Sequence, residues 1–280
     1  MQNTYSIENF SNNGMAFPFD LKNKFENLEN KYFEFQEKAL KALGHEVTLK
    51  PNLLSKFFYN LSIDKSIIQE VKKIIGEDIY IWSSAFFPKK PGSGKIVSYH
   101  QDNPYWQLTT DNVVTAWIAL TDSNKENGAL EIVPGSSKYG LIKDLDVKNP
   151  REAYLKGMKT TESNDLLSYK QNLDVFMSKN KPEIIKLEKN QFSLHHVNSV
   201  HGSGVNNSSV HRIGFAVRYI SSNTKHKMEN IDSAIHVCGK KNKYFVDEVC
   251  PKQDFGEKEI VRYNKAMKAT GAFGNKSYSR

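Results

Sequence analysis

Cysteine is scarce in this chain. Cys238 and Cys250 are its only two cysteines, without Cys-x-x-Cys spacing, so the sequence predicts neither a disulfide framework nor a zinc-thiolate site. No apolar run approaches the roughly 18 residues that a membrane span needs. The N-terminal segment MQNTYSIENF has no basic stretch followed by an apolar one, so it does not resemble a secretory signal. We therefore expect a cytoplasmic protein without a membrane partner.

Acidic residues are fewer than basic ones. Lysine and arginine total 39 against 31 acidic residues, which gives a net charge of +8. The lysines are spread over most of the chain, with the densest groups at 89–95 and 240–243, and no helix-turn-helix, RNA-recognition or zinc-finger pattern accompanies them. We expect no nucleic-acid partner. The excess of lysine reflects an AT-rich genome or helps to attract an anionic substrate.

The chain is rich enough in apolar residues for one enzyme-sized domain over residues 1–280. Hydrophobic residues make up 39% of it and aromatic residues 11%. Residues 1–77 predict a helical layer, with helices over 21–43, 53–61 and 64–76, the last capped by Asp64. Residues 241–280 predict a C-terminal helix, over about 257–268, and a tail.

Between these segments, residues 78–240 change to the two-residue period of β-strands. The expected strands are 79–87, 95–100, 113–120, 130–133, 184–187, 192–196, 213–220 and 234–237. Turn-forming segments such as PKKPGSGK separate them, which is typical of a sandwich, jelly roll or barrel with helices on an outer face. Residues 138–182 are polar and lack a strand period, so we expect an insertion near the site that can act as a lid.

The segment VSYHQDNPYW places polar side chains at the end of a predicted strand. Residues two apart in a strand face the same side, so we expect His100 and Asp102 to point into one cavity. A second histidine from a distant strand would complete two histidines and one carboxylate, a set that suits non-haem Fe(II) because coordination positions stay open. A histidine near a strand end is more often a surface residue, so this segment alone does not establish a metal site.

A second segment, HGSGVNNSSVHRIGFAVRYI, favours the metal site. His201 begins it, and its glycines allow close packing around a metal. Arg212 lies at the start of the next predicted strand, where a guanidinium can bind the far carboxylate of a 2-oxo diacid through two hydrogen bonds. The two segments together predict an iron site with a cosubstrate anchor.

With SSAFFPKKPG and VVTAWIALTDSNKENGALEIVPGSS, these segments resemble the phytanoyl-CoA dioxygenase-like family of Fe(II)/2-oxoglutarate oxygenases. The resemblance covers most of residues 82–220. It implies a mainly β fold with helices: a double-stranded β-helix of the jelly-roll type with an N-terminal helical layer. It also implies Fe(II), 2-oxoglutarate and O2 as cofactor and cosubstrates.

The resemblance carries residue roles as well. It implies His100, Asp102 and His201 as iron ligands, and Arg212 with Ser203 as the site of the C5 carboxylate of 2-oxoglutarate. Trp117 matches an aromatic residue on the cosubstrate side. Related iron halogenases have a small residue where Asp102 stands, so the carboxylate implies an oxygenase.

Three aromatic side chains are candidates for the substrate pocket. Tyr105 and Trp106 follow the ligand pair, and Phe87 ends a predicted strand, but aromatic residues at such places also serve as core. Only one of His195 and His196 can face inward, and neither is expected to bind the metal. Arg218 shares the strand face of Arg212 and stays unassigned.

The expected reaction is hydroxylation of a C–H bond in a small polar molecule, such as an alkaloid or modified amino acid of secondary metabolism. An aminophosphonate or acyl-CoA hydroxylase of the same family is an alternative, although no lysine or arginine can be assigned to a CoA pyrophosphate. A zinc-binding cupin-like protein and a nucleic-acid-binding protein are alternatives of other classes. The sequence does not predict the oligomeric state.

Overall fold

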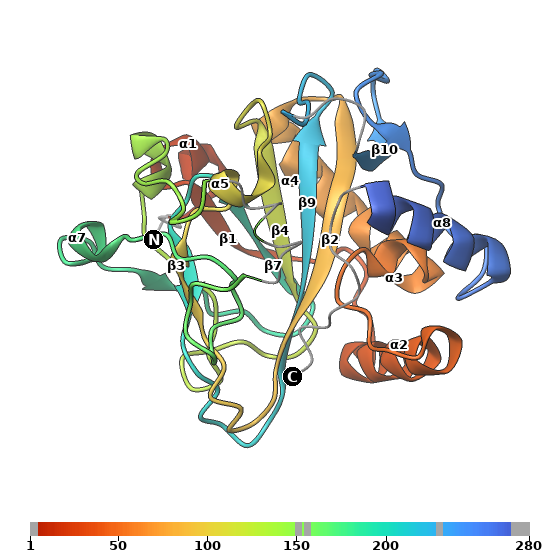
Figure 1. Ribbon diagram of the computed structural model, residues 1–280, viewed down its shortest axis with the longest axis horizontal. Coiled ribbons are helices and arrows are strands. Elements are labelled where there is room, and N and C mark those ends of the chain that lie inside the picture. The colour runs from red at the N-terminus through yellow and green to blue at the C-terminus, as the bar shows by residue number, and fades with distance from the viewer. Residues whose placement is uncertain (1–4, 149–152, 154–157, 228–231, 270–280) are drawn as a thin grey trace.

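Two β-sheets form the centre of the computed structural model, which describes residues 5–148, 153, 158–227 and 232–269 (Figure 1). The larger sheet has the strand order β1 (Met15–Asp20), β7 (Gln191–His196), β4 (Val113–Ala119), β9 (Arg212–Ser221), β2 (Ile79–Lys89), β10 (Ser233–Cys238) and β11 (Val246–Asp247). The smaller sheet has the order β3 (Val97–His100), β8 (His201–Ser203), β5 (Glu131–Ile132) and β6 (Glu183–Ile184). The expected jelly-roll core with accompanying helices is confirmed.

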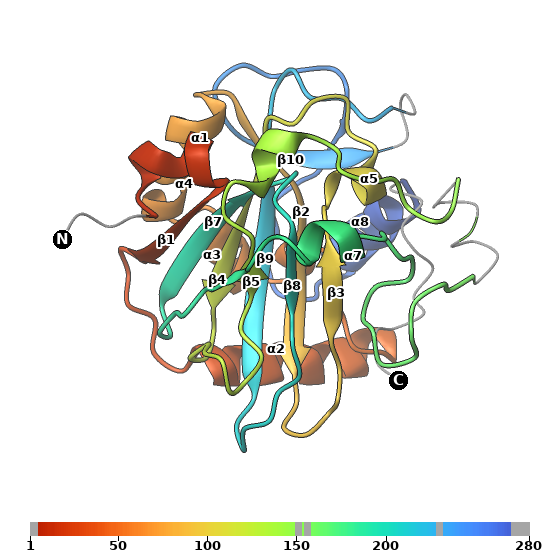
Figure 2. The same ribbon diagram turned by 90° about the vertical axis from the view of Figure 1, so that its left-hand side faces the viewer.

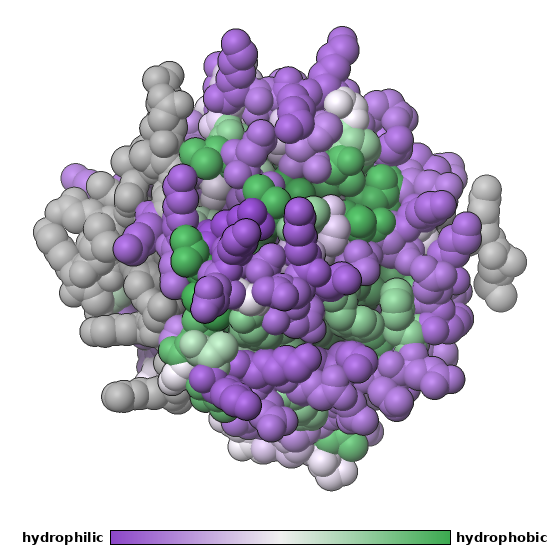
Figure 3. Space-filling view, turned by 90° about the vertical axis from the view of Figure 1, so that its right-hand side faces the viewer, coloured by the Kyte–Doolittle hydropathy of each residue, from purple (hydrophilic) through white to green (hydrophobic). Residues whose placement is uncertain are grey.

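Helices cover the outer face of the larger sheet, and the smaller sheet lies over its inner face (Figures 1 and 2). The covering helices are α2 (Leu28–Leu43), α3 (Lys56–Ser62), α4 (Lys65–Ile75) and α8 (Glu257–Ala269). The main hydrophobic core lies between them and the sheet, and in it Phe58 of α3 meets Phe86 of β2 with ring centroids 4.7 Å apart. The outward surface of this helical side is mainly hydrophilic, with smaller hydrophobic areas (Figure 3). A smaller hydrophobic cluster, which includes Trp117 of β4 and Ile132 of β5, joins the two sheets, so polar and apolar side chains share the inner face.

The N-terminal segment contains a strand that the sequence did not predict. Strand β1 pairs with β7, and Pro18 within it reads as a turn residue in the sequence. Proline is tolerated there because β1 lies at the sheet edge and its pairing shifts register between Ala16 and Phe19. Helix α2 begins at Leu28 instead of residue 21, after Asn27 with a left-handed backbone. The predicted Asp64 cap of α4 is confirmed, because its carboxylate accepts a hydrogen bond from the Ser66 amide at 2.9 Å.

Short elements account for the other departures from the predicted strands. Strand β6 covers only Glu183–Ile184, and Leu187 instead forms an isolated bridge with Ser123. Strand β8 was not predicted, because three residues with two small side chains carry no period. The short helices are η1 (Ile7–Asn9), α1 (Phe10–Asn13), η2 (Pro51–Leu53), α5 (Asn103–Trp106), η3 (Ser136–Tyr139) and α7 (Asp174–Met177).

The described part of the 138–182 insertion lies against the smaller sheet. Ile96, next to β3, forms a bridge with Asp165, and the Gln101 amide donates to the Gln171 side chain at 2.6 Å. Part of the insertion and the predicted tail after residue 269 lie outside the described residues. Within the described residues, no helix is long and apolar enough to cross a membrane.

Candidate metal and cosubstrate site

Two histidines meet where strands β3 and β8 pair. His100 ends β3, His201 begins β8, and the two are direct partners in the antiparallel register. Figure 2 shows the two strands side by side. Asp102 lies outside the strand, contrary to the prediction from strand alternation. Its backbone is helical, with φ −71° and ψ −35°, at the start of α5. The carboxylate therefore reaches the histidines because the chain turns after β3, and strand alternation does not explain it.

The three side chains are buried and close together. Asp102 Oδ1 lies 3.6 Å from His100 Nε2, and Asp102 Oδ2 lies 3.9 Å from His201 Nε2. One ligand atom from each of the three lies within 4.8 Å of the others. Two imidazoles and one carboxylate around one point can hold a divalent transition metal.

Hydrogen bonds orient both imidazoles for this task. His100 Nδ1 lies 2.9 Å from the Ser98 carbonyl, and His201 Nδ1 lies 2.9 Å from the Ser199 carbonyl. A carbonyl can only accept, so each Nδ1 carries the proton and each Nε2 presents its lone pair toward Asp102. Such outer contacts are typical of metal-binding histidines. The residues present fit a metal.

The ionisation of Asp102 and His201 also fits a metal site. Burial raises the pKa of Asp102, but the nearby His201, His100 and Arg218 outweigh burial and lower it to about 2. Burial, followed by the neighbouring His100, lowers the pKa of His201 to about 4. At neutral pH the site thus presents a carboxylate and a neutral imidazole, which are the ligand forms.

A pair of buried cations lies on the same inner face, where strands β2 and β9 pair. Arg212 of β9 and Lys89 of β2 are direct partners in the strand register, and their exposed fractions are 3% and 1%. The Arg212 Nη1 donates to the Phe87 carbonyl at 3.0 Å, and Lys89 Nζ donates to the Ser203 carbonyl at 3.0 Å. Within the described chain, no carboxylate forms an ion pair with either, and Arg212 Nε has no hydrogen-bond partner. Buried positive groups of this kind suit an anionic ligand.

Lys89 was missed by the sequence argument, although a signal for it exists. Residues 83, 85, 87 and 89 of β2 share one face, so strand alternation places Lys89 on the same side as the pocket candidate Phe87. Burial, and then the charge of Arg212, lowers the pKa of Lys89 to about 7. Burial lowers that of Arg212 to about 9, so the guanidinium stays charged at neutral pH.

Trp117 forms a wall of this end of the site. Arg212 Cζ lies 5.5 Å from the centroid of the Trp117 ring, and the ring passes over Gly214. A Cβ atom at Gly214 would lie 2.0 Å from Trp117 Cζ2, so only glycine leaves room for the indole. The structure therefore brings together Arg212, Trp117 and, through Lys89, Ser203.

The three aromatic pocket candidates divide into two groups. The Tyr105 ring contacts the His100 ring edge-on at 5.6 Å, and its hydroxyl donates to the Tyr169 carbonyl at 2.5 Å. Phe87 and Trp106 both lie near Arg218, whose Cζ is 5.6 Å and 5.3 Å from their ring centroids. All three rings are half-buried, and among them Tyr105 contacts a residue of the triad.

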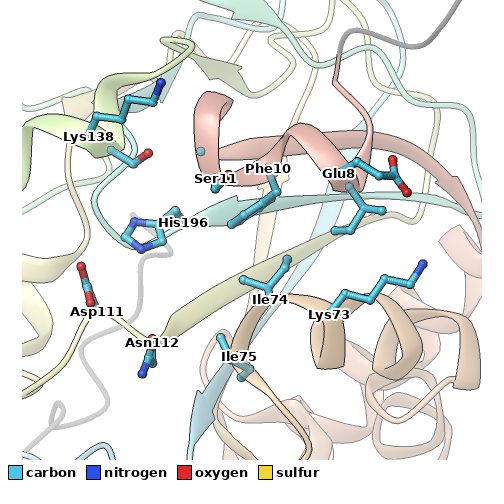
Figure 4. A pocket seen from close by; sticks show the side chains of 13 residues that line it. Glu8, Phe10, Ser11, Lys73, Ile74, Ile75, Asp111, Asn112, Lys138 and His196 are labelled. Carbon is cyan, nitrogen blue, oxygen red and sulfur yellow. The ribbon is translucent and has the colours of Figure 1, made fainter.

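The neighbouring histidines of β7 face opposite sides of the sheet. His195 lies with its ring 4.9 Å from that of His201, and burial lowers its pKa well below the usual value. His196 instead lines a cleft of about 590 Å³ between α1 and α4, with Asp111 nearby (Figure 4). None of the triad lines this cleft.

Known proteins resemble this chain in sequence and in fold. The family model for phytanoyl-CoA dioxygenase (PhyH) matches residues 19–214. A probable alpha-ketoglutarate-dependent hypophosphite dioxygenase of Stutzerimonas stutzeri is 28% identical over 197 residues, which are 67% of this chain and 63% of the relative. The match thus spans less than two thirds of that relative. Phytanoyl-CoA dioxygenase of Arabidopsis thaliana is 30% identical over 135 residues, covering 42% of this chain and 46% of its own.

Solved structures extend the likeness in fold to most of the chain. The apo form of ThoJ, a non-heme monooxygenase, aligns with a TM-score of 0.76 at 22% identity over 94% of this chain and 95% of its own. CytC3 with Fe(II) and alpha-ketoglutarate aligns with a TM-score of 0.61 at 15% identity over 89% and 93%. The family-model match over residues 19–214 identifies the chain as a member of the phytanoyl-CoA dioxygenase family.

Proposed function

We propose that this protein is an Fe(II)- and 2-oxoglutarate-dependent oxygenase that hydroxylates a C–H bond of a small polar molecule. The observation that carries the proposal is the distribution of charge on the inner face. A buried triad of two imidazoles and one carboxylate shares the inner face with a buried Arg212–Lys89 pair that has no carboxylate partner within the described chain. A zinc-binding protein would have no use for the second feature.

The residues divide the work between metal and cosubstrate. His100, Asp102 and His201 would hold Fe(II), which supplies the activation of dioxygen coupled to conversion of 2-oxoglutarate into succinate and carbon dioxide. Arg212 and Lys89 would bind the C5 carboxylate, with Ser203 beside them and the Trp117 ring excluding water. The Nδ1 protons held by Ser98 and Ser199 keep both imidazoles in the binding tautomer.

The substrate belongs to the proposal only as a class. The relatives' names include hypophosphite, ectoine and phytanoyl-CoA, so membership of the family does not choose among them. We favour a small polar metabolite, such as an alkaloid or modified amino acid. The described insertion residues beside the triad, including the carbonyl of Tyr169, offer hydrogen-bonding groups for one.

Succinate release tests the proposal directly. The iron-loaded protein is given 2-oxoglutarate, dioxygen and a panel of amino acids, alkaloids, aminophosphonates and acyl-CoA thioesters, and mass spectrometry looks for products that gain one oxygen atom. His100→Ala and His201→Ala should abolish turnover, whereas His236→Ala on β10 should not. Undiminished succinate release by either triad variant at saturating iron would contradict the assignment.

A further inference from the structure

A buried glutamine lies in the chain between two of the triad residues. Gln101 follows His100 and precedes Asp102, and it is fully buried. A glutamine amide can donate two hydrogen bonds and accept two, and Gln101 makes all four within the protein. These bonds join the turn that carries His100 and Asp102 to three other segments of the chain.

Two parts of the 138–182 insertion meet at this amide. The Gln101 Nε2 donates to the Gly140 carbonyl at 2.6 Å, and the Gln101 Oε1 accepts from the Ile142 amide at 2.9 Å. Gln171 is 4% exposed, and its Nε2 donates to the same Oε1 at 3.2 Å. The Gln171 Oε1 accepts from the backbone amide of Gln101 at 2.6 Å. The two glutamines are thus bonded to each other twice.

The fourth hydrogen bond of Gln101 reaches the loop that leads to the other histidine. Its Nε2 donates to the carbonyl of Asn198 at 2.7 Å, three residues before His201. The Asp102 amide donates to the neighbouring Val197 carbonyl at 3.1 Å. The backbone segments that carry all three triad residues therefore share one hydrogen-bonded network with the insertion.

The insertion also contacts the strand residue that orients His100. Asp165 of the insertion is buried, and its Oδ1 accepts from the Ser98 amide at 3.3 Å. The Ser98 carbonyl in turn accepts from His100 Nδ1 at 2.9 Å. The insertion is thus bonded to the chain both before and after His100.

From this network we infer that Gln101 and Gln171 are positioning residues, which hold the triad in its metal-binding arrangement with the insertion as their support. The inference rests on the proposed function, because it concerns the geometry of the same metal site. Buried hydrogen bonds are costly to break, and loss of an outer contact of a metal ligand lowers metal affinity by about ten-fold to a hundred-fold. A glutamine that served only the stability of the fold would leave metal affinity unchanged.

Cobalt(II) binding by glutamine variants tests the inference. Competition with a fluorescent chelator measures affinity, and the visible absorption of the bound ion reports the geometry of its ligands. Gln171→Leu should lose about ten-fold or more in affinity and shift the absorption bands. Gln171→Glu keeps an acceptor for the Gln101 amide but cannot donate, so it should fall between Gln171→Leu and the native protein. The matched control is Gln36→Leu on α2, because Gln36 is also buried and its amide makes two hydrogen bonds of 2.9 Å with the Val47 backbone.

The control separates positioning from stability, and the native protein separates the inference from the proposed function. Gln36→Leu should keep the native spectrum and an affinity within two-fold of native. Native affinity and spectrum in both Gln171 variants, or an equal loss in Gln36→Leu, would overturn the positioning role alone. Failure of the native protein to bind cobalt(II), or to form the Fe(II)–2-oxoglutarate absorption band under nitrogen, would instead overturn the proposed oxygenase.

Discussion

Arg212 is the residue on which the cosubstrate proposal depends most. Arg212→Ala should weaken 2-oxoglutarate binding at least thirty-fold, about 2 kcal/mol, because a charge-assisted contact in a desolvated pocket is lost. Metal affinity should stay the same, since Arg212 contacts the Phe87 carbonyl and Trp117 and no ligand of the triad. Titration of the Fe(II)–2-oxoglutarate band under nitrogen measures the first quantity. Unchanged cosubstrate affinity would remove Arg212 from the site.

Lys89 predicts a pH dependence of cosubstrate binding. Its pKa of about 7, lowered by burial and by Arg212, means that the free protein loses this ammonium as pH rises above 7. A carboxylate bound beside it favours the charged form, so 2-oxoglutarate affinity should fall by up to ten-fold per pH unit above 7. Calorimetric titrations between pH 6 and 8.5 measure the slope.

Two variants separate Lys89 from other titrating groups. Lys89→Met should bind 2-oxoglutarate weakly and with little dependence on pH over this range. Lys90→Met, at the exposed neighbouring position, should behave like the native protein. A steep slope that persists in Lys89→Met would assign the pH dependence to another group.

At the scale of elements, the packing of the Trp117 ring of β4 on β9 depends on the absence of a side chain at Gly214. Gly214→Ala places a Cβ atom 2.0 Å from Trp117 Cζ2, so the indole or the strand must move. Overpacking of this kind costs about 1–3 kcal/mol and should also weaken cosubstrate binding, because Trp117 adjoins Arg212. Gly204→Ala is the matched control, since its Cβ would approach nothing closer than 4.0 Å. Thermal unfolding of both variants compares them, and equal stabilities would contradict the proposed fit.

Periodic elements could be predicted from the sequence, and irregular ones could not. The strands β4 and β9 and the helix α4 carry long, clear patterns, and their expected positions agree with the structure to within one or two residues. Strand β1 was hidden by Pro18, because the sequence does not say that the strand will lie at an edge. Strand β8 is too short for any period.

The same limit applies to the site. His100, Asp102 and His201 could be grouped from motif and resemblance, and the structure brings them together. The prediction that strand alternation brings Asp102 to the side of His100 was wrong, because a local turn positions Asp102. The face of β2 on which Lys89 lies could have been predicted from strand alternation. Its pairing with Arg212 and the position of Arg218 near Trp106 depend on contacts between segments far apart in the sequence, which a single chain does not reveal.

At the scale of the whole molecule, a buried ion pair links the N-terminal part of the chain to its C-terminal part. Lys50, just before η2, donates to Glu248, which follows β11, and also to the Ser233 carbonyl at 3.0 Å. The two side chains are 3% and 5% exposed. Burial raises the pKa of Glu248 although Lys50 lies beside it, which shows that desolvation of the carboxylate outweighs the attraction. The pair thus fixes the helical layer to the C-terminal strands at a cost.

Breaking this pair should destabilise the fold without touching the site. Lys50→Met leaves the Glu248 carboxylate buried without its cation, so the free energy of unfolding should fall by about 3–5 kcal/mol. The double variant Lys50→Met with Glu248→Leu should recover most of that loss, because two apolar side chains need no desolvation. Lys31→Met, which breaks the exposed Lys31–Glu34 pair at 2.9 Å, should change little. Urea unfolding measures all three, and a Lys50→Met variant as stable as Lys31→Met would show that water reaches the pair in solution.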